Sequence, residues 1–231
     1  MQQMNSIVMQ DGSVRLKQVE IPQPAAGQVL VRSLACGICG SDLHITRHAD
    51  EVFDVFHQLG LMPDEVGEHA QVMLGHEFCA EIVEYGADTQ QTLPVGSRVT
   101  SVPMLLSQNG AGVGVTPGTY GAYSEYFLLD EALLLPVPDE MPSEAAALTE
   151  PLAVGLHAVN RSEIETEETA LVVGCGPIGL AVIAALKQRG VSNILAVDFQ
   201  EEKLLLASEF GANRLINPNK EDEIAVAERY A

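Results

Sequence analysis

The alternation of apolar and polar residues changes near residue 143, which divides the chain into two parts. Up to about residue 142, short apolar segments alternate with polar positions and are separated by Gly- and Pro-rich stretches. This pattern is typical of β structure, and it predicts strands at 28–34, 98–102 and 123–129. The first part is therefore expected to form a β-rich domain.

Beyond residue 143 the apolar runs become longer and alternate between strand and helix patterns. Ser143, followed by Glu144 and an Ala-rich stretch, predicts the start of a helix. This order of elements is typical of the first half of a doubly wound parallel sheet, so the expected fold class is α/β. The pattern predicts strands at 171–173, 194–197 and 214–216, and helices that end at Arg189, span 201–210 and begin near Glu221.

The segment between His44 and His76 carries an apolar stripe at helical spacing. Acidic residues separate its apolar positions, a pattern that predicts an additional amphipathic helix. We expect this stripe to pack against the domain, the alternatives being a substrate entrance or a subunit contact. His48, His57 and His69, in or near it, are interpreted as solvated or capping residues and not as ligands. The stripe consists of Val52, Val55, Phe56 and Leu59.

The composition excludes several classes of function. The 231 residues are 47% hydrophobic and 19% charged, which is typical of a folded globular chain. The 32 acidic residues outnumber the 12 basic ones, and the formal charge of -20 opposes binding to nucleic acid or to an anionic membrane surface. The N-terminus lacks a secretory signal pattern, and glycines and a proline interrupt the longest apolar run, so a cytoplasmic protein is expected.

A glycine motif follows the strand predicted at 171–173 and opens the next helix. Gly174 permits a tight turn, Gly176 lets the backbone approach a pyrophosphate, and Gly179 allows close packing of helix and strand. Asp198 ends the following strand, where a carboxylate can accept hydrogen bonds from the adenosine ribose hydroxyls of NAD. A 2′-phosphate beside Asp198 would bring like charges together, so the motif predicts binding of NAD and disfavours NADP.

Two closely spaced cysteines indicate a metal site in the first part. Cys36 and Cys39 have the spacing of a redox pair or of one half of a structural zinc site, but no second pair follows that would complete four sulfur ligands. Downstream, His76 offers an imidazole, and Glu77 and Glu150 offer carboxylates. One thiolate, one imidazole and one carboxylate would leave a fourth zinc position open for water or substrate, as in catalytic sites.

The motifs GICGSDLH, GHE, EPLAVGLHA and VVGCGPIGLAV occur in this order and resemble those of zinc-containing medium-chain alcohol dehydrogenases, especially the sorbitol and threonine dehydrogenases. The resemblance spans nearly the whole chain. It implies a GroES-like, zinc-binding catalytic domain at 1–153, followed at 154–231 by the first half of a Rossmann NAD-binding domain. The implied activity is a zinc-dependent hydride transfer between a secondary alcohol or polyol and NAD.

The resemblance also implies roles for individual residues. Cys39 and His76 match two zinc ligands, and the third is either Glu77 or Glu150, with Glu77 preferred. Cys36 would then be a packing residue of the turn. The other matched positions are Asp42, which would orient a zinc ligand; Ser41 and His44, a proton relay; Glu150, which would hold the zinc water where it is not a ligand; Gly174, Gly176, Pro177 and Gly179, the pyrophosphate turn; and Ile178, Asp198 and Lys203, which would hold the adenosine ribose.

The chain departs from the family pattern in two places that affect the prediction. Segment 104–120, where the family places four cysteines for a structural zinc, contains none, so one catalytic zinc and no structural zinc are expected. The chain ends at Ala231 inside an expected helix, which predicts a truncated form of a protein that is a homo-oligomer at full length. The alternative function is a non-catalytic remnant that binds zinc or NAD. Polyols, amino alcohols and simple secondary alcohols remain open as substrates.

Overall fold

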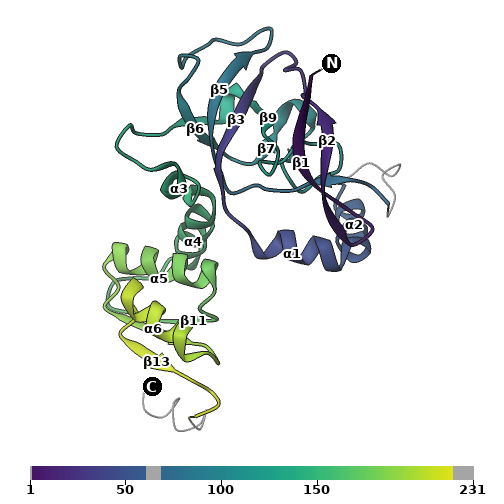
Figure 1. Ribbon diagram of the computed structural model, residues 1–231. Helices are drawn as coiled ribbons and strands as arrows, with labels where there is room; N and C mark the ends of the chain where they lie inside the picture. Colours follow the sequence, from purple (N-terminus) through teal and green to yellow (C-terminus); the bar gives the residue numbers. More distant parts are fainter. Residues whose placement is uncertain (1, 61–68, 221–231) are drawn as a thin grey trace. The chain divides into compact units, whose positions relative to one another are not determined.

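The computed structural model describes residues 2–60 and 69–220 (Figure 1). The chain forms two compact units, Met1–Glu150 and Pro151–Ala231, and each has a hydrophobic core of its own. Within the described ranges, no helix has the length and apolar character needed to cross a bilayer. The helix predicted to begin near Glu221 lies outside the described residues.

The first unit is built around a five-stranded antiparallel sheet with the order β10-β6-β5-β3-β9. Val31 of β3 pairs with Ile82 of β5 on one side and with Phe127 of β9 on the other. The rings of Phe78 and Phe127 meet edge to face in the core, with centroids 4.9 Å apart. The strands are β3 (Gln28–Cys36), β5 (Phe78–Tyr85), β6 (Arg98–Ser101), β9 (Tyr126–Asp130) and β10 (Leu134–Pro136).

A smaller sheet, β2-β1-β4, packs with two helices around a second apolar cluster. Phe53 is the buried residue of the second helix, and Val52 and Phe56 pack partly against the same cluster. The expectation that the whole stripe packs is wrong for Val55 and Leu59, which are 49% and 64% exposed because they lie off the face centred on Phe53. The elements are β1 (Gln3–Gln10), β2 (Ser13–Glu20), β4 (Val72–Met73), α1 (Gly40–Arg47) and α2 (Ala49–Gln58).

The cysteine-free segment 104–120 forms a small lobe, which is held together by internal hydrogen bonds. Thr116 Oγ1 accepts the Gly112 N–H at 2.9 Å. Thr119 Oγ1 lies 3.0 Å from the Gly112 carbonyl oxygen and 2.8 Å from that of Thr116, and both threonines are buried. The lobe contains β7 (Met104–Leu105), the 3₁₀ turn Leu106–Gln108 and β8 (Ala111–Gly112); the 3₁₀ turn Glu131–Leu133 and α3 (Ser143–Ala146) follow later in the unit.

The second unit is a three-stranded parallel sheet in the order β11-β12-β13, with helices between the strands. This arrangement confirms the predicted α/β fold with a partial Rossmann-like sheet. Pro177 begins α5, and Gly190 ends it in a left-handed conformation (φ 93°), which only glycine adopts without strain. Helix α4 (Thr149–Ser162) begins with the last two residues of the first unit. The elements that follow are β11 (Thr169–Val173), α5 (Pro177–Arg189), β12 (Asn193–Val197), α6 (Glu201–Phe210) and β13 (Arg214–Ile216).

The strand predicted at 123–129 begins later than expected. Tyr123 bonds to a segment outside the large sheet, because its N–H donates to the Leu74 carbonyl oxygen at 3.0 Å. A Cβ on Gly121 would lie 2.2 Å from the same carbonyl oxygen, so this segment passes close to Leu74 because glycine has no side chain. This contact carries Tyr123 toward the segment that contains His76.

Candidate functional site

Cys39, His76 and Glu77 come together in the first unit, where one potential ligand atom from each lies within 4.8 Å of the others. Cys39 is half-buried at the N-cap of α1, and His76 and Glu77 are buried between β4 and β5. Within residues 2–60 and 69–220 this is the only such group of His, Cys, Asp and Glu side chains. One sulfur, one nitrogen and one oxygen donor are a set that zinc accepts, with a fourth position left open.

Two glycines allow the segments that carry the candidate ligands to pack closely. A Cβ on Gly37 would lie 2.3 Å from Glu77 Oε2, and the Gly37 N–H donates to the Glu77 carbonyl oxygen at 2.7 Å. Gly75 has φ 103°, and its Cβ would lie 2.7 Å from the backbone nitrogen of Tyr123. A larger side chain at position 37 would collide with the Glu77 side chain, and one at position 75 would collide with Tyr123.

Asp42 faces His76 from the first turn of α1. Asp42 Oδ1 and His76 Nδ1 are 3.4 Å apart, and both atoms are buried without any other hydrogen-bond partner in the described part of the chain. This carboxylate can fix the ring so that Nε2 is available to a metal, an arrangement typical of zinc-bound histidine. The donor set, with His76 Nδ1 turned to Asp42 and Nε2 left for a ligand bond, therefore fits a zinc ion.

The same contacts perturb the pKa values of both residues. Burial lowers the pKa of His76, but the Asp42 carboxylate and the Cys39 sulfur outweigh it and raise the pKa to about 9. Burial raises the pKa of Asp42, but His76, with Tyr123 and the Cys39 N–H, holds it below its ordinary value. Without metal, an imidazolium therefore lies against a carboxylate, and a metal must displace that proton.

Ser41 lies at the group as predicted, with its Oγ 3.0 Å from Cys39 Sγ and 3.4 Å from His76 Nε2. His44, the other member of the predicted relay, is exposed on α1, where its ring lies 4.9 Å from that of His48. Burial raises the pKa of the Cys36 thiol to about 12, and this residue packs partly against the core of the large sheet, as expected for a packing residue.

Glu150 lies near the group without belonging to it. Burial raises the pKa of its carboxyl, His76 lowers it, and Glu77 raises it again, which places Glu150 within electrostatic reach of both residues. Glu77, by contrast, is one of the three clustered residues. The geometry thus favours Glu77 over Glu150 as the carboxylate of a metal site.

The three glycines of the turn in the second unit lie in different surroundings, which a side chain would affect in different ways. Gly174 has φ 92°, and a Cβ on Gly179 would lie 1.9 Å from the Gly174 carbonyl oxygen. A Cβ on Gly176 would meet nothing within 4 Å, so the N-terminus of α5 is open to an approaching group. Backbone N–H groups at a helix N-terminus attract anions such as phosphate. The turn therefore fits a dinucleotide pyrophosphate.

Asp198 lies beside this turn at the end of β12. Its Oδ2 accepts the Cys175 N–H and its Oδ1 accepts the Gln200 N–H, both at 2.9 Å. These two backbone hydrogen bonds hold the pKa of Asp198 below its ordinary value, and Lys203 on α6 lowers it further. Asp198 is thus a fixed anion near the turn. Ile178, another predicted cofactor contact, lies in the first turn of α5 and is 38% exposed.

Sequence reasoning missed Tyr123, which was assigned only to a strand. Its hydroxyl oxygen lies 2.8 Å from Asp42 Oδ2 and 2.8 Å from the Gly37 carbonyl oxygen. No local pattern could reveal this contact, because Asp42 and Tyr123 are 81 residues apart in the chain.

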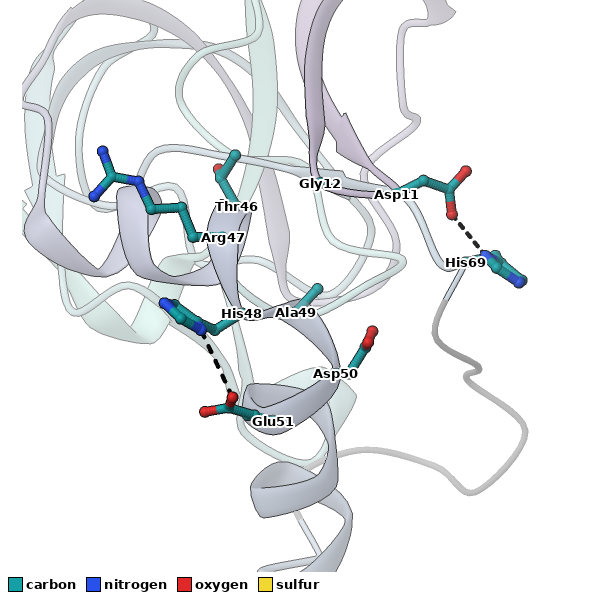
Figure 2. A pocket seen from close by; sticks show the side chains of 9 residues that line it. All are labelled: Asp11, Gly12, Thr46, Arg47, His48, Ala49, Asp50, Glu51 and His69. Atoms are coloured by element: carbon teal, nitrogen blue, oxygen red, sulfur yellow. Dashed lines mark hydrogen bonds and ion pairs between the residues drawn. The ribbon is translucent and has the colours of Figure 1, made fainter.

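A pocket of about 380 Å³ lies between the β1–β2 turn and the junction of α1 and α2 (Figure 2). Its histidines face carboxylates: His69 Nδ1 is 2.6 Å from Asp11 Oδ1, and His48 Nδ1 is 3.7 Å from Glu51 Oε1. None of the candidate metal ligands lines it. The lining residues are Asp11, Gly12, Thr46, Arg47, His48, Ala49, Asp50, Glu51 and His69.

Comparison with known proteins agrees with this architecture. Residues 25–139 match the alcohol dehydrogenase GroES-like domain. The chain is 37% identical to (R,R)-butanediol dehydrogenase of Bacillus subtilis (strain 168), over 94% of this chain and 64% of that protein. It therefore spans about two thirds of the length of this relative.

Solved structures give the same picture. The crystal structure of 2R,3R-butanediol dehydrogenase from Bacillus subtilis matches with a TM-score of 0.83 and 35% identity, over 98% of this chain and 67% of that one. A protein assigned as a zinc-binding dehydrogenase from Sinorhizobium meliloti 1021, bound to NADP, matches with a TM-score of 0.80 and 28% identity, over 96% and 64% of the two chains. The chain belongs to the zinc-containing medium-chain alcohol dehydrogenase family.

Proposed function

We propose that the protein carrying this chain is a zinc-dependent dehydrogenase that transfers hydride between a secondary alcohol or polyol and NAD. The observation that carries the proposal is the convergence of Cys39, His76 and Glu77 on one point, beside an exposed serine hydroxyl. In this proposal residues 1–153 hold a single zinc and the substrate, and residues 154–231 begin the domain for NAD.

The three clustered residues would be the zinc ligands, and Asp42 would hold the His76 ring through Nδ1. When bound, zinc would act as a Lewis acid that lowers the pKa of the substrate hydroxyl. Ser41 Oγ, exposed and next to Cys39 Sγ, would accept the proton of that hydroxyl and pass its own proton through the cofactor ribose to His44. His44, exposed on the same helix, can pass a proton to solvent.

The glycine turn and Asp198 would bind the cofactor. Gly176 would admit the pyrophosphate to the N-terminus of α5, and Ile178, Asp198 and Lys203 would surround the adenosine ribose. The 2′-phosphate of NADP, placed 4 Å from Asp198, would be repelled by up to about 4 kcal/mol at an effective dielectric constant of 20. We therefore infer a preference for NAD, although the Sinorhizobium meliloti relative binds NADP.

The test is NADH formation by the full-length protein with a panel of polyols, amino alcohols and secondary alcohols. The expected result is turnover with at least one class, loss of turnover after removal of zinc with a chelator, and recovery when zinc is returned. Turnover that persists in chelator-treated protein would refute the zinc mechanism. Stoichiometric binding of zinc and NAD without turnover on any alcohol would instead indicate the non-catalytic function.

A further inference from the structure

Tyr123 contacts the residues that support the candidate zinc ligands, and the proposed function gives it no role. Its hydroxyl oxygen lies 2.8 Å from Asp42 Oδ2 and 2.8 Å from the Gly37 carbonyl oxygen, and its single proton can be donated to either. Because the carboxylate is charged, it is the stronger of the two acceptors. Burial and the neighbouring Asp42 carboxylate raise the pKa of Tyr123, so the phenol keeps the proton that it donates.

One oxygen of the Asp42 carboxylate accepts two hydrogen bonds, and the other faces the His76 imidazole. Its Oδ2 receives the Tyr123 hydroxyl and also the Cys39 N–H, the latter at 3.0 Å. Among the residues that the structure describes, its Oδ1 faces only His76 Nδ1. Two donors on Oδ2 restrict rotation of the carboxylate, so Oδ1 stays directed at the imidazole of the buried His76. Loss of one donor would allow the carboxylate to turn.

The rest of Tyr123 is fixed independently of its hydroxyl. Its N–H donates to the Leu74 carbonyl oxygen at 3.0 Å, and its carbonyl oxygen accepts the Ile7 N–H at 3.1 Å. Its ring lies directly against Gly75, where an added Cβ would be 2.9 Å from Tyr123 Cδ1. A phenylalanine at position 123 would keep all of these contacts, so Tyr123→Phe isolates the effect of the hydroxyl.

We propose that Tyr123 is a positioning residue of the zinc site, whose hydroxyl fixes the Asp42 carboxylate that orients the His76 imidazole toward the metal. This inference rests on the proposed zinc-dependent function, because it assigns His76 as a ligand. The role belongs to the hydroxyl, since the ring and backbone contacts would be the same in phenylalanine.

The test compares Tyr123→Phe with the matched control Tyr85→Phe. The Tyr85 hydroxyl donates to the Leu93 carbonyl oxygen at 2.7 Å in the same unit, and both tyrosines are half-buried, so each variant loses one hydrogen bond of a half-buried phenol, to a backbone carbonyl in the control. Zinc affinity of the metal-free chain is measured by competition with a chromophoric chelator, and the visible spectrum of the cobalt-substituted chain reports ligand geometry. We expect zinc to bind about tenfold more weakly to Tyr123→Phe, with a changed cobalt spectrum, and unchanged to Tyr85→Phe.

A second variant tests the route through Asp42. Asp42→Asn should weaken zinc binding at least as much as Tyr123→Phe, and adding Tyr123→Phe to it should have no further effect. Equal zinc affinities for Tyr123→Phe and Tyr85→Phe would overturn the inference, and so would an unchanged affinity in Asp42→Asn, a result that does not require the Tyr123 variant to fold. Absence of zinc binding by the unsubstituted chain would overturn the proposed function together with this inference.

Discussion

Two glycines of the turn, Gly176 and Gly179, should respond differently to substitution by alanine: one change should lower stability and the other should not. In Gly179→Ala the new Cβ would lie 1.9 Å from the Gly174 carbonyl oxygen, a backbone atom that cannot rotate away. We therefore take the upper end of the cost of overpacking, about 3 kcal/mol. Alanine returns about 1 kcal/mol through its better helix propensity within α5. The expected net loss is about 2 kcal/mol of unfolding free energy.

Gly176→Ala is the matched control. Its Cβ meets nothing within 4 Å, and the backbone at φ -73° suits any residue, so stability should change by no more than about 0.5 kcal/mol. The new methyl group would nevertheless occupy the space through which the pyrophosphate approaches, so NAD affinity should fall. Urea unfolding followed by circular dichroism, with calorimetric titration of NAD, separates the two effects. If Gly176→Ala were destabilised as much as Gly179→Ala, our account of the turn would be wrong.

Four further predictions concern the two candidate sites. Asp198→Ser should raise the affinity for NADP relative to NAD by about 10- to 1000-fold, because it removes the like charge; an unchanged ratio in calorimetry would contradict this. Cys39→Ser should weaken zinc binding more than about 100-fold, whereas Cys36→Ser should not, and equal losses in chelator competition would rule out the assigned ligand. Apparent zinc affinity should rise with pH up to about 9, because zinc competes with the His76 proton. In the metal-free chain, the stability contributed by protonated His76 is complete below the ordinary pKa of about 6.5 and is lost as pH rises through about 9, which urea unfolding at several pH values can check.

The second unit was largely predictable because its signals are local. α6 spans Glu201–Phe210 and β13 spans Arg214–Ile216, the ranges that the pattern predicts. Gly211 ends α6 with φ 126°, and a proline begins α5, so sequence marks these boundaries directly. Strands and helices also alternate along the chain, and the order of the strands in the parallel sheet follows from this alternation.

The first unit was less predictable because its determinants are far apart in the chain. Two local elements were also missed: the helix α1, and the β1–β2 hairpin, whose Asp11-Gly12 turn has both residues at positive φ, as a two-residue hairpin turn requires. Val55 and Leu59 were expected to pack but are exposed. The candidate ligands could be named from motifs, but the choice between Glu77 and Glu150 could not be made from spacing. That choice depends on how the segment around Gly37 meets the segment after β4, which only the folded chain shows.

The fold of the cysteine-free lobe at 104–120 does not depend on thiol groups. The hydroxyl hydrogen bonds of Thr116 and Thr119 close this lobe, and neither chelators nor oxidants act on such bonds. Where four thiolates and a zinc hold a segment, metal loss and oxidation unfold it. In this chain, oxidative or chelating stress would reach the candidate group around Cys39 while leaving the lobe intact. Loss of a metal from that group would therefore leave the lobe folded, and return of the metal would not require the lobe to refold.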